Sequence, residues 1–248
     1  MLVLIKENSI QMSIEAAQQV AAQIKLKPDS VIGFATGSTP LLMYKELIRM
    51  HKEEGLDFSK VILFNLDEYV GLPPSHPESY HYFMWENLFK HININKSNVH
   101  IPMGMADNIY VFCDWYEEKI KSYGGIDLQI LGIGGNGHIA FNEPGSSLGS
   151  RTRIKTLGMK TRLDNSRFFS HLEHVPKYAI TMGVGTIMEC KKLLLLASGI
   201  NKAEAIKATV EGPIMAKYPA TIVQYHRYAT IIIDTEAASK LEGEYIDN

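Results

Sequence analysis

The amino-acid sequence predicts an α/β protein built on a mostly parallel sheet with helices on both faces. Short apolar runs alternate with amphipathic stretches along most of the 248 residues, and this alternation is typical of parallel strands joined by helices. Polar, glycine-rich segments directly follow three of the apolar runs. Because ligands bind beyond the carboxyl ends of the strands in such sheets, the same pattern predicts one shared site.

Five apolar runs predict strands, and the stretches between them predict helices. The strands are expected at residues 31–35, 61–66, 128–133, 192–197 and 230–233. The helices are expected at residues 9–24, 39–52, 77–90, 109–123, 201–210 and 236–241. The first helix shows the pattern most clearly, because Ile10, Ile14, Ala17, Val20, Ala21 and Ile24 recur at helical spacing.

Length and composition place the chain among ordinary globular proteins. The length suits one large domain or two small ones, with a sizeable core. The formal net charge is -2, so nothing favours nucleic acid or an anionic membrane surface as a partner. The two cysteines, Cys113 and Cys190, lie far apart, which suits a reducing compartment. No run reaches the roughly 18 apolar residues of a membrane span, and the N-terminal apolar run is too short for a secretion signal. We therefore expect a cytoplasmic protein.

Residues 142–176 differ from the rest of the chain. They are polar, rich in Arg, Ser and Thr, and weakly periodic. Such a segment is either a plain surface excursion or a mobile lid over a binding site. The residues alone leave both alternatives open.

The motif ATGSTP follows the first predicted strand. Gly37 permits a tight turn, Ser38 and Thr39 can cap the next helix, and Pro40 suits its first turn. A turn of this kind exposes backbone N–H groups at a helix N-terminus and can bind an anion. An ordinary capped helix start is the alternative, since the motif has neither P-loop nor dinucleotide-binding spacing.

Two adjacent acids, Asp67 and Glu68, follow the second predicted strand. Neighbouring side chains on an extended backbone point to opposite faces, so one acid can face the site while the other faces away. A partly desolvated carboxylate at a strand end is a candidate general base. The alternative is a solvated acid in a turn.

The third motif is GIGGNGHIAFNEPG, with four glycines in the six positions 132–137. Its spacing does not match a dinucleotide fingerprint, and Arg153 occupies the position where the ribose-binding acid is expected. His138 lies beside the glycines, with Asn136 before it and Glu143 after it. An imidazole can both give and take a proton near neutral pH, and a neighbouring carboxylate would orient it. This arrangement favours a catalytic histidine.

Other catalytic arrangements are weaker. Ser146 and Ser147 lie near His138, but no nucleophile elbow surrounds them. The histidine pairs 76/81 and 171/174 lack metal-ligand spacing, so no metal is expected. Arg167 and Lys202 are candidate phosphate partners, and Lys202 follows another predicted strand.

Three long segments resemble the glucosamine-6-phosphate deaminase family. They are FNLDEYVGLPPSHPESY, LGIGGNGHIAFNEPGSSLGSRTRIKTL and NSRFF, and the similarity extends over about residues 31–234. The resemblance implies a single Rossmann-like domain over residues 1–248. It also implies conversion of glucosamine 6-phosphate and water to fructose 6-phosphate and ammonia, without cofactor or metal.

The resemblance assigns roles by motif. Asp67 matches the base that moves a proton between C2 and C1, and His138 matches the residue that opens the sugar ring, with Glu143 and Asn136 as its orienting partners. The positions that match phosphate- and substrate-binding residues are Thr36, Gly37, Ser38, Thr39, Tyr80, Arg167 and Lys202. Ser146, Arg153 and Lys155 match part of the site at which larger, hexameric members bind N-acetylglucosamine 6-phosphate. This chain is similar to shorter members, so we expect a monomer without that control.

One position departs from the family pattern, because many members have aspartate where this chain has Asn136. A neutral amide cannot stabilise an imidazolium as a carboxylate does, so Glu143 alone is expected to supply the negative charge. Two other functions are consistent with this kind of fold. They are a 6-phosphogluconolactonase-like hydrolase and a non-catalytic sugar-phosphate sensor. The DEY and GHIAFNEP segments argue against the first, and retention of Asp67, His138 and Glu143 argues against the second.

Overall fold

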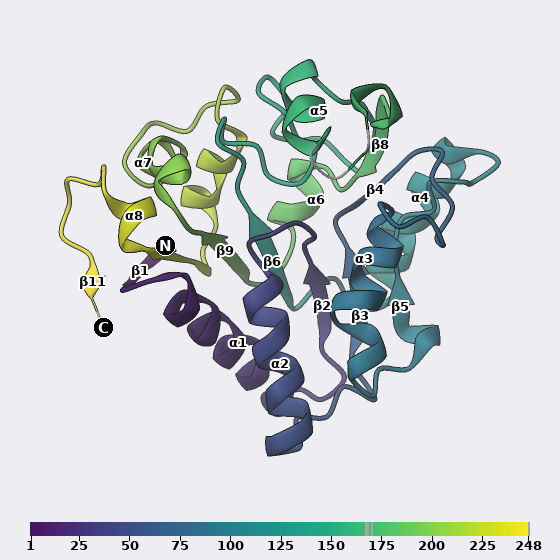
Figure 1. Ribbon diagram of the computed structural model, residues 1–248, viewed down its shortest axis with the longest axis horizontal. Coiled ribbons are helices and arrows are strands. Elements are labelled where there is room, and N and C mark those ends of the chain that lie inside the picture. The colour runs from purple at the N-terminus through teal and green to yellow at the C-terminus, as the bar shows by residue number, and fades with distance from the viewer. Residues whose placement is uncertain (167–168, 170, 248) are drawn as a thin grey trace.

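A computed structural model describes residues 1–166, 169 and 171–247. Its main sheet has eight strands in the order β11-β1-β10-β9-β6-β2-β3-β5 (Figure 1), and every pairing in it is parallel. The strands are β1 (Leu2–Lys6), β2 (Val31–Phe34), β3 (Ile62–Asn65), β5 (Val99–His100), β6 (Leu128–Gly132), β9 (Leu193–Ala197), β10 (Ala229–Asp234) and β11 (Ile246–Asp247). The predicted fold class is confirmed.

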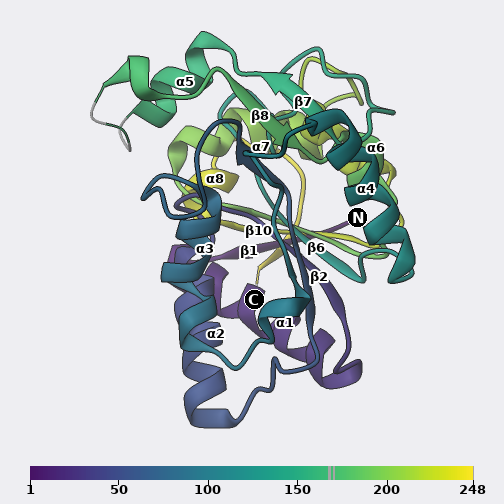
Figure 2. The same ribbon diagram turned by 90° about the vertical axis from the view of Figure 1, so that its right-hand side faces the viewer.

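Helices cover both faces of this sheet. Figures 1 and 2 show α1, α2 and α3 on one face and α4 on the other. The helices are α1 (Ser9–Leu26), α2 (Leu41–Glu54), α3 (Tyr80–Asn87), α4 (Ile109–Ser122), α5 (Met159–Asn165), α6 (Val184–Met188), α7 (Ala203–Val210) and α8 (Thr235–Ala238). Short 3-10 helices are η1 (Phe89–His91), η2 (Lys96–Asn98), η4 (Leu172–His174), η5 (Ile200–Lys202) and η6 (Pro219–Tyr225).

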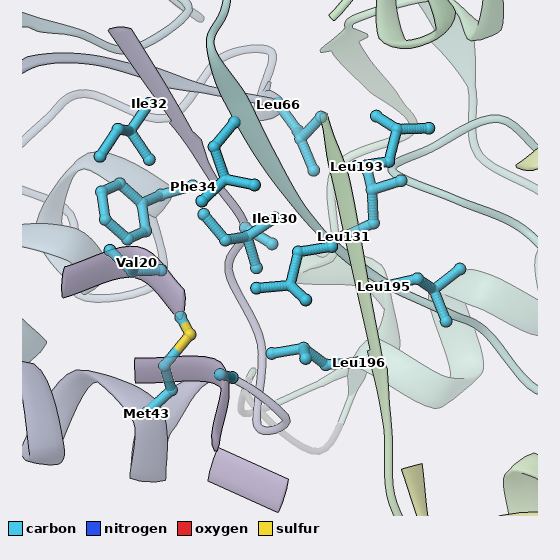
Figure 3. Packing of buried hydrophobic residues seen from close by; sticks show 14 of the residues in the cluster. Val20, Ile32, Phe34, Met43, Leu66, Ile130, Leu131, Leu193, Leu195 and Leu196 are labelled. Atoms are coloured by element: carbon cyan, nitrogen blue, oxygen red, sulfur yellow. The ribbon is translucent and has the colours of Figure 1, made fainter. Parts of the chain in front are cut away.

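The core lies between the sheet and its helices. Because both faces are covered, the strands are continuous apolar runs, and all five residues of β9 are buried. Figure 3 shows Leu193, Leu195 and Leu196 of this strand beside Ile130 and Leu131 of β6. The predicted strands and helices are all present, with boundaries shifted by up to three residues. The helix expected from 201 begins at Ala203 as α7, because residues 200–202 form the 3-10 helix η5.

A second sheet, which the sequence did not predict, lies above the carboxyl ends of the main sheet (Figure 2). It has three antiparallel strands in the order β4-β8-β7: β4 (Asp67–Tyr69), β7 (Arg153–Thr156) and β8 (Tyr178–Thr181). The segment 142–176 therefore contains a strand and the helix α5. Strands β1, β5 and β11 and the helix α6 were also not predicted. β5 and β11 have only two residues each and α6 has five, which is too short for periodicity to reveal. The apolar run of β1 is as long as that of β9, and no strand was assigned to it from the sequence.

The buried carboxylate of Glu117 joins the second sheet to α4. It accepts hydrogen bonds from the backbone N–H of Thr152 at 2.8 Å and from the Thr186 hydroxyl at 2.6 Å, and it pairs with Arg151 at 2.5 Å. Burial raises the pKa of Glu117, but these donors outweigh burial and leave the pKa below its usual value. The carboxylate is therefore charged and satisfied, and it fixes the loop that leads into β7.

Gly104 lies close to the backbone of β4. A Cβ on Gly104 would lie 1.9 Å from the Tyr69 carbonyl oxygen. Backbone atoms cannot yield as a flexible side chain can, so the strand that begins with Asp67 would have to move.

We predict that Gly104→Ala destabilises the protein by about 1–3 kcal/mol, because the added methyl group collides with β4. The free energy of unfolding in urea measures this loss. Gly149→Ala is the matched control, since a Cβ at the exposed Gly149 meets nothing within 4 Å, and it should stay within about 0.5 kcal/mol of wild type. Equal stability of the two variants would contradict the prediction.

Candidate active site

A cavity of about 250 Å³ lies at the carboxyl ends of β9, β6, β2 and β3. These four strands are neighbours in that order. The chain adds β3 and β5 on one side of β2 and then returns to add β6 on the other side, which makes β2 and β6 a topological switch point. The three motifs therefore line the same cavity. Its predicted lining residues are Thr36, Gly37, Ser38, Thr39, Asp67, Tyr80, His138 and Lys202.

The segment 36–39 forms the turn between β2 and α2. Gly37 has φ +99°, a conformation that side chains with a Cβ rarely adopt. The prediction that Ser38 or Thr39 caps the helix is wrong, because α2 begins after Pro40 with no side-chain cap. Both residues line the cavity instead. The hydroxyls and the uncapped N-terminus of a 14-residue helix together suit an anion.

Asp67 and Glu68 lie where the chain passes from the main sheet into the antiparallel sheet, so they open β4 rather than close β3. As expected for neighbours on a strand, the two acids diverge. Asp67 lines the cavity. Glu68 accepts hydrogen bonds from the backbone N–H groups of Tyr69 at 2.8 Å, Tyr80 at 3.0 Å and His81 at 2.9 Å.

Burial governs the protonation of both acids. Burial first, and then the neighbouring charge of Glu68, raises the pKa of Asp67 well above its ordinary value. Burial also raises the pKa of Glu68, to about 7, although its three N–H donors act in the opposite direction. A carboxylate with a raised pKa binds a proton more strongly, which suits a group that takes and returns one.

His138, Asn136 and Glu143 form a chain of hydrogen bonds. The Nδ1 atom of His138 lies 2.7 Å from Oδ1 of Asn136, and Nδ2 of Asn136 donates to Oε2 of Glu143 at 3.4 Å. A carboxylate only accepts, so the amide turns its nitrogen to Glu143 and its oxygen to His138. The imidazole must then carry its hydrogen on Nδ1, which leaves Nε2 as the basic nitrogen of the neutral ring.

The glycines of this loop allow the ring to lie against the backbone. A Cβ on Gly134 would lie 2.2 Å from the imidazole of His138. Gly137 has φ +79°, and Ala140 adopts a positive φ of 50°. The histidine ring thus accounts for the glycine at position 134, whereas Gly137 is required by its positive φ and by the Tyr218 side chain, which a Cβ would approach to 2.6 Å.

Lys202 reaches the site from the loop after β9. Its Nζ donates to the carbonyl of Ile133 at 2.7 Å. Both carboxylate oxygens of Asp234 accept from the N–H of Gly199 at 3.0 Å and so fix the start of that loop. Arg167, the other predicted cation, lies outside the described residues.

Helix α5 and the residues after it supply cavity residues to which the sequence analysis assigned no role. Thr161, Asn165 and Phe169 line the cavity from the segment 142–176. Asn165 donates to the Tyr69 hydroxyl at 3.0 Å, and Phe169 packs edge-on against the Tyr69 ring. Asn165 and Phe169 belong to the NSRFF segment, but that segment marked only Arg167 as a candidate. Thr161 lies in no motif, and the contact between Asn165 and Tyr69 joins residues 96 positions apart.

The three residues expected at an effector site lie apart from this cavity. Arg153 and Lys155 are alternate residues of β7 and share one face of the strand. Ser146 is buried in the turn after Glu143, and its N–H donates to the Glu143 carbonyl at 2.9 Å. None of the three lines the described cavity.

Two further searches covered the described part of the chain. No helix there is long and apolar enough to cross a membrane. No group of three or more His, Cys, Asp or Glu side chains among the same residues could hold a metal ion.

Comparison with known proteins identifies the family to which this chain belongs. The model of the glucosamine-6-phosphate isomerase/6-phosphogluconolactonase family matches residues 6–232, and the chain belongs to that family. A glucosamine-6-phosphate deaminase of Thermoanaerobacter sp. (strain X514) is 58% identical over 244 residues, which are 98% of this chain and 96% of that protein. One from Halothermothrix orenii is 56% identical over 97% of this chain and 100% of its own length. The resemblance inferred from the motifs is confirmed.

Solved structures agree with this assignment. A monomeric glucosamine-6-phosphate deaminase superimposes with a TM-score of 0.95 at 45% identity, over 97% of this chain and 100% of its own. A 6-phosphogluconolactonase from Trypanosoma cruzi gives a TM-score of 0.75 at 21% identity, over 98% of this chain and 97% of its own. The second similarity is one of fold alone.

We predict that Asp67→Asn stabilises the protein at pH 8. Because the folded state raises the pKa of Asp67 above 3.8, its stabilising contribution is complete below that value and is lost as the pH rises through the folded pKa. The neutral amide of Asn does not ionise, so the free energy of unfolding of the variant at pH 8 should be higher by about 1 kcal/mol or more. Urea unfolding at pH 8, 6.5 and 5 should show a gain that shrinks as the pH falls. The exposed Asp107→Asn serves as control, and a variant less stable than wild type at pH 8 would contradict the argument.

Proposed function

We propose that the protein is a glucosamine-6-phosphate deaminase, which converts glucosamine 6-phosphate and water to fructose 6-phosphate and ammonia. The observation that carries the proposal is that Asp67 and His138 line one cavity, with His138 held from behind by hydrogen bonds through Asn136 to Glu143. Curated relatives with this function at 54–58% identity support it. In this proposal the whole chain acts as one catalytic domain.

The phosphate end of the substrate is bound by the 36–39 turn, by Lys202 and by Arg167. Backbone N–H groups at a helix N-terminus and two cations suit a dianion. These phosphate contacts are remote from the reacting carbons, so their binding energy is available to position the sugar. Tyr80 contacts the substrate from the start of α3.

His138 opens the pyranose ring by moving a proton between the C1 hydroxyl and the ring oxygen. The Nδ1–H bond to Asn136 keeps Nε2 basic for this step, and Glu143 orients the amide. Asp67 then takes the proton from C2 and returns it to C1, which one carboxylate can do because the two carbons are adjacent. Water adds at C2 and ammonia leaves, which completes the stoichiometry with no redox change.

A 6-phosphogluconolactonase-like hydrolase is the alternative enzyme. It would need a phosphate site and a histidine, which this cavity has, but it has no use for a base at two adjacent carbons. The raised pKa of Asp67 and its place in the cavity favour the deaminase. A non-catalytic sensor would not require such an acid at all.

We further propose a monomeric, cytoplasmic enzyme that N-acetylglucosamine 6-phosphate does not activate. The solved relative at 45% identity is itself described as monomeric. Ser146, Arg153 and Lys155 are then the remnant of an effector site, apart from the cavity.

The direct test is release of ammonia from glucosamine 6-phosphate, coupled to glutamate dehydrogenase. We predict turnover by the wild type and a loss of at least about 100-fold in kcat for Asp67→Asn, because a positioned general base contributes about 10²–10⁴. Asp107→Asn should retain full activity. Hydrolysis of 6-phosphogluconolactone without ammonia release would favour the alternative enzyme, and undiminished Asp67→Asn activity would remove the assigned base.

Asn136→Asp should change the pH dependence of the reaction. A carboxylate beside Nδ1 stabilises the imidazolium and raises the pKa of His138. We therefore predict that the limb of the kcat/KM–pH profile due to His138 moves to higher pH by about one unit. Asn136→Ser, which keeps a neutral side chain, should not move it upward. If both limbs of the kcat/KM–pH profile stayed in place in Asn136→Asp, the prediction would be wrong.

A further inference from the structure

The inward face of α5 carries two polar side chains four residues apart. Thr161 and Asn165 occupy the same side of the helix, and both line the cavity. Thr161 is 3% exposed. A buried hydroxyl costs free energy unless it makes a hydrogen bond, so the partner of the Thr161 hydroxyl matters.

The Thr161 hydroxyl donates to Oε1 of Glu143. The other carboxylate oxygen, Oε2, accepts from Asn136. Each oxygen of Glu143 therefore has its own donor, and the two donors come from opposite directions along the chain. Gly158 lies close on the same side, because a Cβ there would be 3.9 Å from the carboxylate.

Of these two hydrogen bonds, the weaker one, from Asn136 to Glu143, connects the carboxylate to His138. At 3.4 Å, the contact between Asn136 and Glu143 is too long to hold the carboxylate by itself. The terminal torsion of a glutamate is broad, so an untethered carboxylate turns readily. The Thr161 bond removes this freedom.

We propose that Thr161 is a positioning residue: it holds the Glu143 carboxylate toward Asn136, so that α5 completes the hydrogen-bond chain that orients His138. The same helix reaches the other acid–base centre, because Asn165 donates to the hydroxyl of Tyr69, two residues after Asp67. Helix α5 thus connects the ring-opening group and the isomerisation base. The inference rests on the proposed function for its kinetic consequence, but not for its geometry.

Thr161→Val removes the hydroxyl and keeps the shape, and Thr161→Ser keeps the hydroxyl and loses a methyl group. For the valine variant we predict a loss of about tenfold in kcat, KM within about twofold of wild type, and a shifted pH profile, since a hydrogen bond to a charged group is lost. The serine variant should remain within about threefold of wild type. A purely structural role would instead reduce both activities in proportion to lost stability, which urea unfolding measures.

A double-mutant cycle with Glu143→Gln shows whether Thr161 acts through Glu143. We expect Thr161→Val to cost little further activity in the Glu143→Gln background, because the group it positions is already lost. Losses that multiply would mean that Thr161 acts independently of Glu143, and would overturn the inference.

The titration of His138 gives a readout that needs no turnover. ¹⁵N NMR of the imidazole should show a lower pKa for His138 in Thr161→Val than in wild type, because a displaced carboxylate stabilises the imidazolium less. The value in Thr161→Ser should match wild type. An unchanged titration in the valine variant would overturn the inference even if the wild type releases no ammonia, whereas absence of ammonia release alone would count only against the proposed function.

Discussion

The site depends on one constraint, the adjacency of β9, β6, β2 and β3 in a parallel sheet. Parallel strands present all their carboxyl ends at one edge, so four loops from distant parts of the sequence must meet there. The strand order reverses at β2, so the connections after β2 and β6 lead away from each other and leave a crevice between them. The cavity is therefore a product of topology before any side chain is considered.

The antiparallel sheet turns this edge into a buried site. Because β4 follows β3 after a single residue, Asp67 leaves the main sheet and pairs with Thr181 of β8. Its carboxylate is thereby desolvated, which raises its pKa. Burial raises the pKa of the neighbouring Glu68 too, and the backbone N–H groups at the start of α3 oppose that rise only in part. Both acids of the strand therefore bind a proton more strongly than a free carboxyl group does.

The two acid–base centres differ in how they are held. Asp67 is fixed by the backbone pairing of β4, and its protonation is controlled by burial. His138 is fixed by a chain of side-chain hydrogen bonds that passes through a neutral amide to Glu143. A series of hydrogen-bonded side chains is well ordered only if its terminal residue, here Glu143, is itself held in place. That is why a residue on α5, outside the glycine-rich motif, bears on the histidine.

The sequence by itself determined the fold class, five of the eight strands of the central sheet and the three motifs. These follow from local signals, namely apolar runs, glycine-rich turns and the position of polar residues directly after strands. It also placed Asp67, His138 and Lys202 at one edge, since parallel strands leave no other arrangement. Only the tertiary structure decided that Glu68 faces α3, that Asn136 turns its oxygen to His138, and that Thr161 and Asn165 reach the cavity. Those contacts join residues up to 96 positions apart, and the short β4, β7 and β8 that bring them together have no periodicity of their own.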